Sequence, residues 1–212
     1  MLPGIPPQIL EPYRPISFRE SFYLRARWRL CPYGLIDSLL PDSGNILDFG
    51  CGYGLLSNYL ISSAPFRTVT GIDINGNRIR TAKRSVKDRK NISFHCTSID
   101  RLETARYDSV VMTDVLHHIN DANLNLLLEI LSSSLKNKGT LVILDVDRKP
   151  FLKFCITYLI DTVLNPSDRL YYRSAKGLQD IFNKYPFIQR KLFRADRGLP
   201  LSDIIFLLER IF

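Results

Sequence analysis

The sequence predicts an α/β fold in which helices cover both faces of a mostly parallel sheet. Three observations support this prediction. Strand and helix patterns alternate along most of the chain, a glycine-rich turn over residues 50–54 follows the first apolar strand, and Asp73 ends the second. A nucleoside-binding βαβ unit has its glycine turn and its ribose carboxylate in these two places, so the same segments predict a nucleoside site.

The expected elements follow one another in a regular order. The helix expected over residues 121–137 has the clearest pattern, because five leucines between residues 124 and 135 fall on one stripe. Gly139 follows its expected end. Two later apolar runs, 188–193 and 203–211, are separated by turn residues and predict a closing pair of strands. The other strands are expected near 45–50, 68–74, 92–98, 107–114 and 139–147, and the helices near 54–64, 76–87 and 121–137.

Two segments lie outside this alternation. Five prolines between residues 3 and 15 predict an irregular beginning, after which residues 16–30 mix aromatic side chains with arginines in a basic amphipathic helix. Together they form an N-terminal helical extension over residues 1–43, ahead of a domain over 44–212. The helix can pack across the sheet edge, close a pocket or lie on a membrane. The second segment is an apolar insertion near 149–173, which charged residues interrupt too often for a membrane span.

Composition indicates a single domain in a reducing compartment. The 212 residues are 45% hydrophobic, which is enough for one sizeable core. Four scattered cysteines and the absence of a signal-peptide pattern at the start predict a cytoplasmic protein. The formal net charge is +8, with basic residues crowded into 14–29 and 78–90. This field can attract nucleic acid or an anionic membrane, although for 78–90 a solvated helix face is the simpler interpretation.

The spacing of the glycines distinguishes two cofactor classes. A dinucleotide fold carries Gly-x-Gly-x-x-Gly around a bound pyrophosphate. Here Gly50, Gly52 and Gly54 alternate, and Leu55 follows them. Asp48 adds a negative charge that repels a pyrophosphate but attracts an ammonium or a sulfonium. The predicted ligand is therefore cationic.

With these features, residues 45–147 resemble the class I S-adenosylmethionine (SAM)-dependent methyltransferases of the small-molecule type, and Ile46–Gly54 resembles their motif I. The resemblance implies SAM as the cofactor and a Rossmann-like, doubly wound sheet of seven strands with the last strand antiparallel. It gives Asp73 both ribose hydroxyls, and it puts Ser98 where many relatives carry the acid for the adenine amino group, with Asp100 as the substitute. The residues expected to bind the cofactor are Asp48, Gly50, Cys51, Gly52, Gly54, Asp73, Ile74, Ser98, Ile99, Asp100, Thr113 and Asp114.

The segment Tyr107–Ile119 resembles the fourth-strand motif of the same enzymes, including its Leu-His-His ending. It differs from the motif that serves exocyclic or amide nitrogen, so the resemblance favours oxygen or carbon as the acceptor atom. Adjacent histidines on a helix cannot aim at one point, and Asp145 and Asp147 alternate along a strand, so no metal site is predicted. His117 is the candidate general base, with packing or pocket lining as the alternative.

The two segments outside the sheet suggest the kind of acceptor. Enzymes of this class often build a substrate lid from such segments, and here both are aromatic and apolar. We therefore expect a small apolar or amphiphilic acceptor, with a membrane surface as one place of presentation. Two alternatives stay open: an RNA methyltransferase that uses the basic surface, and a non-catalytic SAM-binding subunit of a partner protein. The residues assigned to the substrate or the lid are Trp28, His118, Asp145, Phe151, Phe154 and Tyr158.

Overall fold

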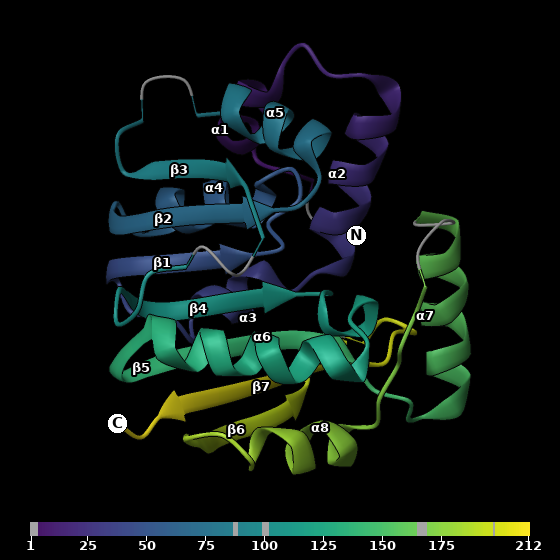
Figure 1. Ribbon diagram of the computed structural model, residues 1–212. Coiled ribbons are helices and arrows are strands. Elements are labelled where there is room, and N and C mark those ends of the chain that lie inside the picture. The colour runs from purple at the N-terminus through teal and green to yellow at the C-terminus, as the bar shows by residue number, and fades with distance from the viewer. Residues whose placement is uncertain (1–3, 87–88, 99–101, 165–168, 197) are drawn as a thin grey trace.

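The computed structural model describes residues 4–86, 89–98, 102–164, 169–196 and 198–212, which contain one seven-stranded sheet (Figure 1). The strands are β1 (Ser43–Phe49), β2 (Phe66–Asp73), β3 (Ile92–Cys96), β4 (Tyr107–Thr113), β5 (Leu135–Val146), β6 (Phe187–Arg194) and β7 (Asp203–Arg210). They lie in the order β3-β2-β1-β4-β5-β7-β6, and β7 runs antiparallel to both of its neighbours. The predicted α/β class and the antiparallel last strand are confirmed.

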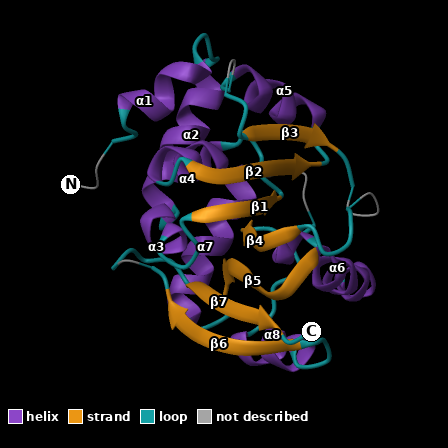
Figure 2. Cartoon of the chain, turned by 90° about the vertical axis from the view of Figure 1, so that its left-hand side faces the viewer, coloured by secondary structure: helices purple, strands orange, loops and turns teal. Residues whose placement is uncertain are grey.

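Helices cover both faces of this sheet, and Figure 2 shows α3 and α4 on one side and α6 on the other. Each face therefore has its own hydrophobic core, as expected for a doubly wound sheet. The helical segments are α1 (Pro7–Leu10), η1 (Glu11–Tyr13), α2 (Phe18–Leu30), α3 (Tyr33–Asp37), α4 (Leu55–Ser63), α5 (Gly76–Arg84), η3 (Leu116–His118), α6 (Asp121–Ser134), α7 (Phe151–Leu164) and α8 (Ala175–Phe182).

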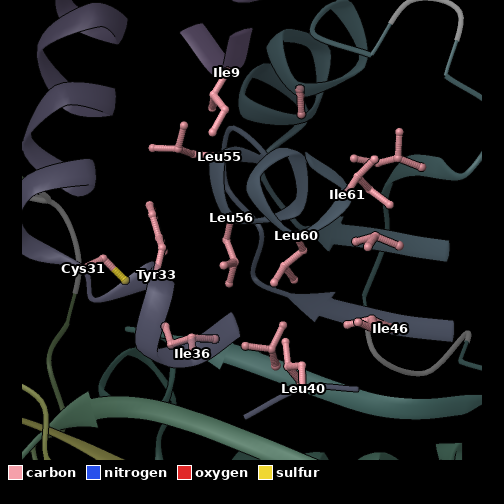
Figure 3. Close-up of a cluster of buried hydrophobic side chains, with 14 of the residues drawn as sticks. Ile9, Cys31, Tyr33, Ile36, Leu40, Ile46, Leu55, Leu56, Leu60 and Ile61 are labelled. Atoms are coloured by element: carbon pink, nitrogen blue, oxygen red, sulfur yellow. The ribbon is translucent and has the colours of Figure 1, made fainter. Parts of the chain in front are cut away.

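The first core holds the glycine turn in place from below. In Figure 3, Leu56 and Leu60 of α4 point toward Ile36 and Leu40 of the α3 region, close to Ile46 of β1. The second core forms under α6 and α8, where the predicted leucine stripe of α6 is buried. Because helices pack on both faces, a ligand can reach the sheet only at the ends of its strands, and in this fold class the carboxyl ends bind ligands.

The boundary between α6 and β5 differs from the sequence prediction. The leucine pattern predicts a helix over 121–137, but α6 ends at Ser134 and Leu135 already begins β5. Leu135 has extended backbone and pairs with Tyr107 of β4, so strand pairing overrides the local helix preference. Gly139 consequently lies inside β5, at a shift in the pairing register with β4, and does not end the helix.

The N-terminal extension packs on the α4 face of the sheet. Pro7 begins the short helix α1, a position that tolerates proline because the first N–H groups of a helix lack intrahelical partners. The beginning is thus more regular than the prolines predict. Tyr13 is buried, and Asn58 of α4 donates to its hydroxyl oxygen at 3.0 Å. Helix α2 then begins with a capping box, in which Ser17 and Glu20 each accept the other's backbone N–H.

Helix α7, in the insertion after β5, stands apart from both cores. In Figure 1 it lies on the side to which the parallel strands point, beyond the end of the sheet. No α7 side chain belongs to either core cluster among the described residues. Within that part of the chain, no helix has the length and hydropathy to cross a bilayer.

Candidate active site

A cavity of about 680 Å³ opens at the carboxyl ends of the parallel strands, where open α/β sheets bind ligands. Its walls come from the turn after β1, the end of β2, the turn after β3 and the loop after β4. Helix α2 contributes Tyr23, Leu24 and Arg27, and the insertion contributes Asp161 and Tyr171. The predicted site residues that line the cavity are Gly50, Cys51, Gly52, Asp73, Ile74, Ser98, Thr113, Asp114, His117 and His118.

Gly50, Gly52 and Gly54 of the turn differ in what surrounds them. All three have positive φ, which favours glycine. A Cβ on Gly50 would lie 2.5 Å from a methyl carbon of Val115, and one on Gly54 would lie 2.4 Å from the ring of Phe94. Gly52 is different, because its Cβ would meet nothing within 4 Å and would project into the space beside the cavity wall. Gly52 therefore lets a ligand approach the backbone, whereas Gly54 does not line the cavity and serves packing.

Asp48 does not face the cavity, so the prediction that its charge meets the ligand is wrong. Its side chain is fully buried and accepts a hydrogen bond from Ser57 Oγ of α4 at 2.5 Å. Burial raises the pKa of this carboxyl to about 6. Through this hydrogen bond, Asp48 connects the end of β1 to α4, the two elements that the turn joins.

Asp73 is held where a ribose carboxylate belongs. Its Oδ2 accepts the N–H of Gly52 at 2.9 Å, and its Oδ1 accepts the N–H of Asn75 at 2.7 Å. Each carboxylate oxygen has a further lone pair, so the fixed group can still accept from two adjacent hydroxyls. With the open backbone at Gly52 beside it, this arrangement fits the sugar of a nucleoside.

The turn after β3 forms the wall where the resemblance expects the adenine. Thr97 and Ser98 line the cavity there, and the N–H of Thr97 donates to the carbonyl oxygen of Asp73 at 3.2 Å. Ile99 and Asp100, which are expected beside the ring, lie outside the described residues. Ser98 is thus on the expected wall, and its contact with adenine stays a prediction.

In the loop after β4, His117 lies against Asp145 of β5. The distance between His117 Nδ1 and Asp145 Oδ1 is 2.7 Å, and Asp145 Oδ2 accepts the N–H of Leu116 at 2.7 Å. Tyr172 stacks on the imidazole at 5.2 Å between ring centroids, and its hydroxyl donates to Asp161 at 2.7 Å. The other ring nitrogen, Nε2, has no hydrogen-bond partner within the described part of the chain and lies 3.8 Å from Asp161 Oδ2.

This environment favours the imidazolium form of the ring. Burial opposes the charge, but three carboxylates outweigh it and raise the pKa of His117 from 6.5 to about 9. They belong to Asp145, Asp114 and Asp161. For Asp145, burial alone would raise the pKa, but the facing imidazolium and its hydrogen bonds lower it below the ordinary value. The pair is therefore a charged one at neutral pH, with His117 among the residues that line the cavity and Asp145 behind it.

An ion pair ties the N-terminal helix to the loop after β4. Arg27 Nη1 donates to Asp114 Oδ2, and both side chains are mostly buried at the cavity wall. Burial opposes the guanidinium charge, but Asp114 raises the pKa of Arg27 well above its ordinary value. Asp114 itself has positive φ (56°), an uncommon conformation for a residue with a side chain. The loop after β4 is thus held in one conformation by α2.

Five of the predicted substrate and lid residues do not line the cavity. Trp28 packs between Tyr33 and Tyr59, with ring centroids 5.6 Å from each, and so belongs to the α3–α4 core. Asp145 acts from behind His117. The remaining three are on α7: Phe151 is exposed, while Phe154 and Tyr158 contact Tyr172 at 5.0 and 5.9 Å. The hydrophobic pattern of α7 cannot show which of its faces turns to the cavity.

Several lining residues were not predicted from the sequence, and Tyr23, Arg27 and Asp161 are polar examples. Tyr23 and Arg27 are four positions apart, so they share one face of α2, a spacing that was readable. Asp161 is a lone carboxylate in an apolar stretch, and such a group needs a partner when it is buried. The described residues contain no group of three or more His, Cys, Asp or Glu side chains suited to a metal ion.

The strand order and the cavity together define a class I methyltransferase fold. Residues 46–139 match the model of a methyltransferase domain family, and the strand order of the described chain agrees with that match. SAM is the methyl donor in this family. A crystal structure of a Pyrococcus horikoshii protein is similar in fold, with a TM-score of 0.73, 20% identity, and coverage of 94% of this chain and 98% of that one.

Curated relatives match at low identity. A ubiquinone biosynthesis O-methyltransferase of Coxiella burnetii is 28% identical over 145 residues, which are 67% of this chain and 53% of the relative. A malonyl-[acyl-carrier protein] O-methyltransferase of Acetivibrio thermocellus is 31% identical over 130 residues, 58% of this chain and 44% of the relative. The chain thus spans about half the length of these two relatives.

Proposed function

We propose that this chain transfers the methyl group of SAM to an oxygen atom, or to a carbon, of a small apolar or amphiphilic acceptor. One observation carries the proposal: a single cavity has the Asp73 carboxylate on one wall and the imidazole of His117 on another. The first group suits a nucleoside sugar, and the second suits an acceptor that must lose a proton.

The cavity wall that contains Asp73 and Gly52 would bind the cofactor. Asp73 would accept from the ribose hydroxyls, while Gly52 would leave room for the ligand against the backbone. Bound there, SAM supplies a methyl group that its sulfonium already activates. The chain then has to position the acceptor in line with that methyl group and to keep water out.

The apolar walls support the acceptor class. Tyr23, Tyr33 and Leu127 line the cavity beside its polar groups, which suits a molecule with an apolar body and a reactive oxygen. The curated relatives reported above are O-methyltransferases by name. The names of these relatives favour oxygen over carbon. We extend the proposal to the chain segments: residues 1–43 and the insertion near 149–173 act as a lid on the domain of residues 44–212.

His117 would act as the general base. It must be neutral to accept a proton at Nε2, and its pKa of about 9 leaves it charged at neutral pH. A cation bound in the same cavity disfavours a second positive charge and lowers that pKa. Binding therefore prepares the base, and an acceptor that is already an anion would need none.

Radiolabelled methyl transfer tests the proposal. The purified chain is incubated with methyl-tritiated SAM and with separate lipid, RNA and protein extracts, and then with simple phenols, catechols and carboxylates. We expect label in the lipid extract and in the small molecules. Label in RNA alone would contradict the proposed acceptor class, and SAM binding without transfer to any fraction would contradict catalysis. Asp42→Asn, on an exposed loop, is the control for Asp73→Asn, which should lose transfer.

A further inference from the structure

Helix α7 has its apolar face outward. Leu152, Leu159 and Val163 lie on one stripe and are 79%, 64% and 71% exposed, with Ile156 between them. On the opposite side, Asp161 lines the cavity and bonds to Tyr172. A helix on a water-exposed surface normally has the reverse arrangement, so this face is built to meet something other than water.

Helix α2 adds a second exposed apolar site beside the same cavity. Phe18 is 86% exposed, and Phe22, one turn later, is also exposed. Arg25 and Arg29 continue the same stripe at helical spacing and are exposed too. Figure 1 shows both helices on the side to which the parallel strands point. Each helix also lines the cavity with side chains of its opposite face, so both border the site.

The charges around these faces are positive. Arg148 and Lys149 are exposed immediately before α7, and like Arg25 and Arg29 they form no ion pair within the described part of the chain. The acidic residues of the two helices point inward: Glu20 accepts a hydrogen bond from Thr81 Oγ1, and Asp161 accepts one from Tyr172. The net charge of the whole chain is +8.

We propose that the outer faces of α7 and α2 dock on an anionic lipid bilayer. The apolar stripe of α7 inserts at the boundary between head groups and acyl chains, and the flanking arginines and lysines contact lipid phosphates. The exposed arginines and lysines beside the two patches complement an anionic lipid surface, and a fluid bilayer, unlike a folded partner, needs no matching groove for either patch. A consequence, which rests on the proposed function, is that a lipophilic acceptor reaches the cavity from the bilayer.

Vesicle co-sedimentation tests the docking without reference to catalysis. The full chain is spun with vesicles of phosphatidylcholine alone and with vesicles that also contain phosphatidylglycerol. We expect binding to the anionic vesicles that falls as salt is raised, and much weaker binding to the neutral ones. In the double variant Leu152→Ser/Leu159→Ser the bound fraction should correspond to an affinity reduced about tenfold or more.

The matched control is Phe66→Ser, because Phe66 is equally exposed but begins β2 at the opposite end of the sheet. Its binding should equal that of the wild type. No binding of the wild type to anionic vesicles, or equal loss in both variants, would overturn the proposal. A wild-type dimer that the double variant converts to a monomer would assign the face to a second copy instead. SAM affinity, measured by calorimetry on the same samples, reports separately on the proposed function and should be the same in all three proteins.

Discussion

Because His117 is paired with Asp145, removal of the Asp145 carboxylate should lower the pKa of His117 toward its ordinary value. The pKa of His117 is raised from 6.5 to about 9, which corresponds to about 3 kcal/mol of preference for the imidazolium. Asp145 Oδ1 lies 2.7 Å from Nδ1, whereas Asp161 Oδ2 lies 3.8 Å from Nε2. In Asp145→Asn we expect the midpoint of His117 to fall by about 2 pH units, as the removal of a close opposite charge does.

Nuclear magnetic resonance measures this titration directly. The chain has three histidines, His95, His117 and His118, and His117→Gln identifies the signal by its loss. The wild type should show one imidazole with a midpoint near 9, and Asp145→Asn should move the same signal to about 7. His95 is the internal reference, because it lies on the exposed side of β3. A wild-type midpoint at or below 6.5, or one that the variant leaves in place, would refute the reasoning.

The same pair makes stability depend on pH. A histidine whose pKa is raised in the folded state contributes fully below the unfolded value of 6.5, and the contribution is lost as the pH rises through about 9. Between these pH values the wild type should lose up to about 3 kcal/mol of unfolding free energy relative to His117→Gln. Urea unfolding of both proteins at each pH gives the difference, and parallel curves would contradict the charged pair.

Three further changes test other parts of the site. Asp73→Asn should weaken binding of S-adenosylhomocysteine about tenfold to a hundredfold in calorimetry, because a neutral amide bonds the ribose hydroxyls less strongly than a carboxylate. Gly54→Ala should lower the free energy of unfolding by about 3 kcal/mol in urea titrations, because its Cβ would lie 2.4 Å from Phe94 at a φ of 75°. Arg27→Met should cost about 2 kcal/mol in the same assay, because it leaves Asp114 mostly buried without its partner.

Matched controls separate these effects from general damage. Gly198→Ala has the same backbone requirement as Gly54→Ala (φ 78°) but nothing within 4 Å of the new Cβ, so it should be the milder change. Arg25→Met removes an exposed charge from the same helix and should leave stability nearly unchanged. Equal losses in either matched pair would contradict the packing or ion-pair argument, and an unchanged affinity in Asp73→Asn would contradict the ribose contact.

The sheet was largely predictable because its signals are local. Apolar runs ending in Asp48 and Asp73, with a glycine turn between them, identify βαβ geometry, and the resemblance supplies the strand order that periodicity cannot. The end of α6 was not predictable, since the leucine stripe continues unbroken to Leu135 while the backbone changes from helix to strand. Pairing with Tyr107, far away in sequence, decides that point.

The site was predictable only where a residue's position followed from a strand end. Asp73, Asp114 and His117 reach the cavity for that reason. The prediction that Asp48 contacts the ligand failed because both faces of a buried strand are covered. The alternation of side chains along such a strand does not show which residues face the cavity. The residues predicted to line the cavity from the insertion do not line it, for a different reason. Helix α7 has its apolar face outward, so apolar residues do not mark the interior there.

A crystal structure with S-adenosylhomocysteine tests the central claim most directly. The account predicts that both ribose hydroxyls lie within hydrogen-bond distance of the Asp73 carboxylate, with the sulfur on the side of the cavity that holds His117. An ordered nucleoside elsewhere on the molecule, or a cavity that stays empty at saturating ligand and instead binds a nicotinamide or flavin nucleotide, would contradict it.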